Sequence, residues 1–211
     1  MNINELIKKA HENAVQKGFY DCHACVENPE CPLCKGTGVN HNKNIDELLM
    51  LIVSELGEAL EAHRKDRFSK FDLSVPFIGS VTVDKLLNGL NSNLSGANTY
   101  FEEHIKDTFE DELADVAIRL FDLCGYLNIE PVDFPHGVDC PENVGEGLLE
   151  ITSLICEFKE DNNHSWRNEK MYEIIDYLKF FCETHNIDLE KYIELKMKYN
   201  ETREYKHGKK Y

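Results

Sequence analysis

The pattern of hydrophobic and polar positions along this chain is mainly that of amphipathic helices. Apolar residues recur three or four positions apart, as at Leu49, Ile52 and Leu56, and this spacing places them on one helical face. Gly18 follows the first apolar stripe and is typical of a helix end. The predicted helices span residues 3–18, 45–65, 101–127, 145–159, 168–184 and 188–203.

Two segments lack helical periodicity and are predicted to be insertions. Residues 20–43 contain cysteines, prolines and glycines, and residues 66–100 contain short β-like runs followed by a polar, turn-rich stretch. A short hairpin at 75–83 is one prediction for the second insertion. Three prolines make residues 128–144 a connection between helices. The chain is therefore predicted to be one all-α domain, residues 1–211, in which a helical bundle carries two insertions.

One weak internal similarity links two helix ends. CGYLNIE at 124–130 resembles CETHNID at 182–188, an offset of 58 residues, and each follows an amphipathic helix. Two interpretations stay open: an internal repeat, or two ordinary helix ends.

The composition and the charge restrict the function classes. The chain has 211 residues, of which 42% are apolar, enough to bury a sizeable core. Its net charge of -16 argues against a nucleic acid or an anionic membrane as partner, because such surfaces are bound through excess positive charge. The sequence contains no run of about 18 apolar residues, so it predicts no membrane span. We expect a cytoplasmic protein, in which a phosphate-bearing ligand would need metal cations between itself and the carboxylates.

Two pairs of acidic residues at a spacing of three are candidate metal ligands. Glu55 and Glu58 are interleaved with apolar residues, and Glu112 and Asp115 lead directly into an apolar stripe. Spacing alone is weak, since 39 acidic residues give about seven such pairs by chance. Carboxylates beside an apolar stripe are costly to bury unless they are paired or bind metal, and four of them on facing helices would suit Mg²⁺ or Mn²⁺. A di-iron site is set aside, because the only Glu-x-x-His sequence lies in the tail.

The C-terminal segment carries a second candidate binding set. Lys196, Asn200 and Arg203 fall on one helical face, and their side chains are suitable donors for phosphate oxygens. The competing interpretation is that the cations only complement the dipole of a final helix. In a chain of net charge -16, a cationic cluster beside two acidic helices predicts instead a phosphate bound from both sides.

Four cysteines are clustered in the first insertion as Cys22-x2-Cys25-x5-Cys31-x2-Cys34. Chance predicts about 0.3 CxxC pairs in such a chain, so two within thirteen residues indicate a site. Four thiolates at this spacing suit a structural, tetrahedral Zn²⁺, and the segment resembles the CxxCxGxG knuckles of DnaJ-type zinc modules. A redox dithiol is the alternative, and His23 is a less suitable ligand.

Four segments together resemble the MazG-type, all-α nucleoside triphosphate pyrophosphohydrolases, which include phage and bacterial MazG-like proteins. They are HENAVQKGF at 11–19, LIVSELGEALEAHRK at 51–65, FEDELADVAIRLFDLCGYLNI at 109–129 and IDLEKYIELKMKYNETREYKHGKK at 187–210. They cover well under half of the chain but span nearly its whole length. The ExxE…ExxD pattern alone is a weak sign of this family. Together with KxxxNxxR and a following HGK in register, it is quite specific.

This resemblance implies a helical, Mg²⁺-dependent enzyme that cleaves a nucleoside triphosphate between its α and β phosphates and forms homo-oligomers, either dimers or tetramers. The implied Mg²⁺ ligands and catalytic carboxylates are Glu55, Glu58, Glu112 and Asp115. One glutamate of the first pair would accept the proton of the attacking water. The implied phosphate contacts are Lys196, Asn200 and Arg203.

The chain also departs from the family pattern. Fifty-three residues separate Glu58 from Glu112, and residues 66–100 would be the added segment. Residues 131–186 precede the C-terminal motif, and one interpretation makes them a degenerate second helical repeat through which one chain imitates a family dimer. The zinc knuckle at 20–43 is the third departure. The alternative function is a zinc-containing helical module that senses nucleotides or binds a protein without turnover.

Overall fold

The computed structural model describes residues 3–22, 30–70, 83–92, 95–129, 140–160 and 164–205. This part of the chain contains eight helices and, apart from one isolated bridge, no β-structure, so the all-α prediction is confirmed. The helices are α1 (Ile3–Gln16), α2 (Ile45–Arg64), α3 (Val83–Asn91), α4 (Ser95–His104), α5 (Phe109–Leu127), α6 (Val144–Glu160), α7 (His164–Thr184) and α8 (Leu189–Thr202).

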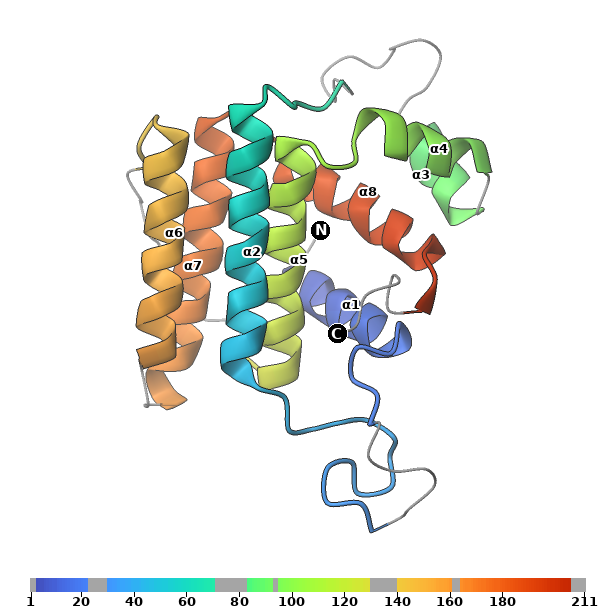
Figure 1. Ribbon diagram of the computed structural model, residues 1–211, viewed down its shortest axis with the longest axis vertical. Helices are drawn as coiled ribbons and strands as arrows, with labels where there is room; N and C mark the ends of the chain where they lie inside the picture. The colour runs from blue at the N-terminus through green and yellow to red at the C-terminus, as the bar shows by residue number, and fades with distance from the viewer. Residues whose placement is uncertain are drawn as a thin grey trace.

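Four long helices lie side by side and form the main bundle (Figure 1). In it α2 packs against α5, α6 packs against α7 and α2, and α5 also contacts α7. On the other side of α5 lie α1 and α8, and α3 and α4 pack on α8. Helix α5 is therefore central and buries residues on most of its circumference. Acidic residues on such a helix are enclosed by its neighbours.

Side-chain caps fix where three helices begin. Asn44, Thr108 and Asp188 each accept a hydrogen bond from a backbone N–H in the first turn of α2, α5 and α8 respectively. The first turn of α5 is acidic, and the helix dipole favours negative charge at that end. The cap at Thr108 thus sets the position at which the carboxylates of α5 enter the bundle.

The internal similarity of the sequence corresponds to one helix-end geometry. At the end of α5, Asn128 is left-handed with φ 52° and the Ile129 N–H donates to the Cys124 carbonyl at 3.0 Å. After α7, Asn186 is left-handed with φ 58° and Ile187 donates to the carbonyl five residues before it at 2.8 Å. These hydrogen bonds are those of a Schellman motif at a helix end. The shared motif accounts for the similarity between residues 124–130 and 182–188. Whether residues 131–186 are also a repeat stays a prediction.

Some boundaries differ from those that the sequence predicts. The prediction that residues 66–100 are non-helical is wrong for α3 and for the beginning of α4. The helix predicted at 101–127 is two helices, because the chain turns at Asp107, whose φ is 60°. Most of the hairpin predicted at 75–83 lies outside the described residues, and so do residues 130–139 of the proline-rich connection.

The helices of the second insertion have a packing reason. Leu86, Leu87 and Leu90 form a short apolar stripe on α3 and are buried, and α3 contacts α8 and α4. None of the helices in the described part of the chain combines the length and the apolar character that a membrane crossing needs.

We expect Leu120→Ala to lower the free energy of unfolding by about 2–5 kcal/mol, because it removes a fully buried side chain from the central helix and leaves a cavity. Urea denaturation measures the change. The control is Leu149→Ala on α6, where the side chain is 69% exposed and we expect a change within about 0.5 kcal/mol. Equal losses in the two variants would contradict the central position of α5.

Candidate functional site

Three carboxylates from α2 and α5 converge between the two helices. Glu55, Glu58 and Glu112 each offer an oxygen, and these oxygens lie within 4.8 Å of one another. Glu55 and Glu58 are one turn apart on α2, and Glu112 lies in the first turn of α5, which packs on α2. The exposed fraction is 4% for Glu55 and 5% for Glu112, whereas Glu58 is open to solvent. The structure thus brings together three of the four carboxylates predicted from sequence.

Burial changes the protonation equilibria of this cluster. It raises the pKa of Glu112 to about 8, with Lys196 opposing the rise and neighbouring carboxylates, first among them Asp115, adding to it. Burial also raises the pKa of Glu55 above its ordinary value, although Arg119 offsets part of the effect. The Glu112 carboxylate has no hydrogen-bond or ion-pair partner among the described residues. A divalent cation would supply the missing positive charge, so this set of oxygen donors fits Mg²⁺ or Mn²⁺.

A cleft with a cavity volume of about 140 Å³ opens beside the carboxylate cluster and is lined by α1, α2, α5 and α8. Glu55 and Asp115 lie on its wall. Two of the three predicted phosphate-binding residues, Asn200 and Arg203, also line it. The cationic lining residues that sequence reasoning missed are Lys17, Lys43 and Arg119.

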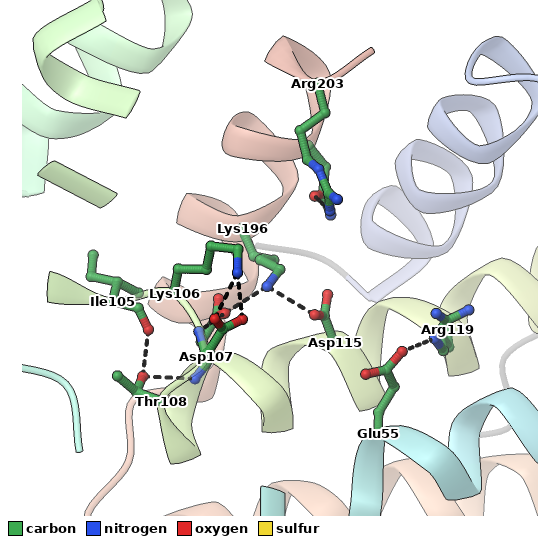
Figure 2. A network of polar contacts seen from close by, with 11 residues as sticks. Glu55, Ile105, Lys106, Asp107, Thr108, Asp115, Arg119, Lys196 and Arg203 are labelled. Atoms are coloured by element: carbon green, nitrogen blue, oxygen red, sulfur yellow. Dashed lines mark hydrogen bonds and ion pairs between the residues drawn. The ribbon is translucent and has the colours of Figure 1, made fainter. Parts of the chain in front are cut away.

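The third predicted phosphate ligand, Lys196, lies between two carboxylates of α5 instead. Its Nζ is 2.6 Å from Asp111 Oδ2. The same Nζ is 2.8 Å from Asp115 Oδ2 (Figure 2). Burial acts to lower the pKa of Lys196, but the two carboxylates outweigh it and hold that pKa above its usual value. Lys196 is 4% exposed and is not part of the cleft wall. It therefore neutralises buried negative charge and ties α8 to α5.

Arg119 links the cleft to the carboxylate cluster. Its Nε donates to Glu55 Oε1 at 2.6 Å, across the contact between α5 and α2 (Figure 2). Arg119 follows Asp115 by four residues and so shares its helical face, which is the signal in the sequence that could have identified it. Lys17 and Lys43 carry no comparable signal, because Lys17 follows the end of α1 and Lys43 is the last residue of the first insertion, so neither lies on a helical face.

Three of the four clustered cysteines come together in the first insertion. The Sγ atoms of Cys22, Cys31 and Cys34 lie within 4.8 Å of one another, and those of Cys22 and Cys31 are 3.7 Å apart. A Zn–S distance of about 2.3 Å gives a tetrahedral edge of about 3.8 Å, so these thiols have separations that suit zinc. The described cysteines form no disulfide. Cys25 and His23 lie outside the described residues, and the fourth ligand stays a prediction.

The backbone around the thiols forms a compact knuckle. The Cys22 N–H donates to the Gly38 carbonyl at 2.8 Å, and the Lys35 N–H donates to the Cys31 carbonyl at 2.7 Å. Lys35, Gly36 and Gly38 all have positive φ, so the two glycines supply turns that most other residues would resist. The segment lies beyond the end of the helical bundle, between α1 and α2 (Figure 1).

The geometry combines three oxygen donors, two of them buried, with a neighbouring cleft that has cations on its wall and with a separate thiol cluster. Such an arrangement can hold an anionic ligand jointly through metal ions and cationic side chains. Comparisons with protein-family models, curated proteins and solved structures find no match for this chain.

We expect protein purified without added metal to carry about one Zn²⁺ per chain, held by the cysteine cluster. Elemental analysis measures the content, and Cys34→Ser should remove most of the zinc because it deletes a ligand. The matched control is Cys156→Ser on α6, an exposed cysteine remote in sequence from the cluster, which should leave the content unchanged. Absent zinc together with four titratable thiols in the cluster would refute the assignment.

We expect Lys196→Met to lower the free energy of unfolding by about 3–5 kcal/mol, because it leaves Asp111 and Asp115 without their buried counter-ion. Urea denaturation measures the loss. Lys198→Met is the control, since Lys198 pairs with Glu201 near the surface and its loss should cost about 0.5 kcal/mol or less. A loss in Lys196→Met no larger than in the control would show that the pair does not stabilise the fold.

Proposed function

We propose that this chain is a Mg²⁺-dependent pyrophosphohydrolase of the MazG type that converts a nucleoside triphosphate into a nucleoside monophosphate and pyrophosphate. The observation that carries the proposal is the convergence of Glu55, Glu58 and Glu112 beside a cleft that cations also line. Enclosed carboxylates need a cation, and a polyphosphate needs the same cation to approach a protein of net charge -16. The resemblance of the helical segments to this family supports the same activity.

The carboxylate cluster would hold the metal. Glu55, Glu58 and Glu112 would be ligands, and Asp115 would join through the oxygen that is not bound to Lys196. Bound Mg²⁺ would neutralise phosphate charge and make a coordinated water more acidic. The alternative, a module that binds nucleotides without turnover, would use the same ligands.

The chain's own side chains would position the triphosphate and receive the proton. Arg203 and Asn200 would donate to phosphate oxygens from α8, and Arg119 from α5. Attack of water on the α-phosphorus forms a P–O bond while the bond to the bridging oxygen breaks and pyrophosphate leaves. Glu58 would accept the proton of the water through the carboxylate oxygen that does not bind the metal, because no side chain in the described part of the chain pairs with it, whereas Arg119 holds Glu55.

The zinc knuckle would have a structural part in this activity. It joins α1 to α2, and both helices line the cleft. A closed set of four thiolates leaves no open coordination position for chemistry. We also propose that the chain forms a homo-oligomer, as the family resemblance implies.

The direct test is a panel of all the common NTPs and dNTPs with Mg²⁺, scored separately for pyrophosphate and orthophosphate. Pyrophosphate together with the monophosphate would support cleavage between the α and β phosphates. Orthophosphate with the diphosphate would reject it, and so would the absence of any release from a folded protein.

We expect Glu112→Gln and Asp115→Asn each to lower turnover by about a hundredfold or more, because each removes a charge from the carboxylate site. Steady-state kinetics measures turnover, and far-UV circular dichroism checks the fold. The control is Glu150→Gln, which neutralises an exposed acid on α6 and should leave turnover unchanged. Full activity in either site variant would refute the metal-site assignment.

A further inference from the structure

The part of the cleft farther from the carboxylate cluster carries apolar side chains, with Lys43 and Glu47 also on its wall. The apolar side chains are Leu48 and Leu51 of α2, Ile118 of α5, and the small Ala10 and Ala14 of α1. Leu48 precedes Glu55 by seven residues, which is about 10 Å along α2. The cavity volume of about 140 Å³ is well below the roughly 300 Å³ at which pockets for drug-sized ligands begin.

A fixed carboxylate lies in this apolar part. Asp122 is one turn after Ile118 on α5 and lines the cleft. His11 Nδ1 is 2.8 Å from Asp122 Oδ1, and the Tyr20 hydroxyl donates to the same oxygen at 2.9 Å. The Tyr20 ring is itself stacked on Tyr126, with 5.5 Å between the centroids. Asp122 Oδ2, in contrast, has no hydrogen-bond partner among the described residues.

A second acceptor lies on the same cleft. Asn13 Oδ1 of α1 is buried and has no hydrogen-bond partner within the described chain. Leaving a buried polar atom unpaired costs free energy, so a ligand donor is the expected complement. An amide can turn its nitrogen toward a ligand instead, whereas the Asp122 carboxylate can only accept. The fixed carboxylate therefore decides which ligand groups fit.

We propose that this part of the cleft binds the base of the nucleotide and selects a base that carries an exocyclic amino group. The inference rests on the proposed function and names the substrate class of the same site. The phosphates would lie toward Glu55 and Asp115, and the ring would lie between the apolar side chains of α1, α2 and α5. An amino N–H would donate to Asp122 Oδ2, while a carbonyl oxygen at that position would face another acceptor.

The matched pair of probes is dCTP and dUTP, because the two bases have nearly the same size. They differ at C4, which carries an amino group in cytosine and an oxo group in uracil, and at N3, which is an acceptor in cytosine and an N–H in uracil. We expect kcat/KM to be about tenfold or more higher for dCTP, since a site built for a donor rejects an analogue that lacks it. Equal values, or a preference for dUTP, would overturn the proposal.

Asp122→Asn is the decisive variant, because an amide can turn its nitrogen to the oxo group. We expect the ratio of the dCTP and dUTP values to fall toward one. A milder second variant is Tyr20→Phe, which removes one of the two contacts that fix Asp122 and should lower the ratio in part. Glu150→Gln on α6 is the charge-matched control and should keep the ratio. Equal losses for both nucleotides in Asp122→Asn would make the residue structural and overturn its role in selection.

A binding measurement separates failure of the inference from failure of the proposed function. The probes are the α,β-imido analogues of dCTP and dUTP with Mg²⁺, titrated calorimetrically against the full chain. Tighter binding of the dCTP analogue without hydrolysis of any nucleotide would reject the activity and support the base site. Hydrolysis of dCTP and dUTP at equal efficiency would reject the base site and support the activity.

Discussion

The ion pairs of Lys196 with Asp111 and Asp115 are the interaction on which the rest of the site depends. They join α8 to the central helix α5, and of the three charged groups Lys196 and Asp111 are buried while Asp115 is partly exposed. Without this cation, the Asp111 carboxylate would be buried and uncompensated, which is unfavourable by several kcal/mol, and Asp115 would lose its partner. Because α8 is held in this way, Asn200 and Arg203 reach the cleft, and α3 and α4 have a helix on which to pack.

The thiol cluster acts on the same cleft through its backbone. The Tyr126 hydroxyl accepts from the Lys43 N–H at 2.8 Å and donates to the His41 carbonyl at 2.9 Å. The Asn40 N–H donates to the Tyr20 carbonyl at 2.6 Å. The knuckle is thereby attached to the pair of stacked tyrosines that fixes Asp122. The thiol cluster at the end of the bundle is thus linked to the proposed base site through backbone hydrogen bonds and Tyr20.

Much of the helical framework follows from local patterns, and its exceptions have physical reasons. The long amphipathic stripes of α2, α5, α6, α7 and α8 are visible in the sequence because each faces a large core. The apolar stripe of α3 is too short to stand out from its polar neighbours, and packing against α8 and α4 stabilises it. The break before α5 depends on Asp107 in a left-handed conformation, which local composition does not predict.

The sequence by itself determined the helical class, the two acidic pairs and the cysteine cluster, because these depend on spacing along one helix or one loop. Tertiary structure alone decided the partners of these groups. Lys196 and Asp111 are 85 residues apart, and Arg119 and Glu55 are 64 apart. The bond between Tyr20 and Asp122 spans 102 residues. Such pairs are fixed by how helices pack, and since burial sets the strength of a charge interaction, the role of Lys196 was decided by its enclosure.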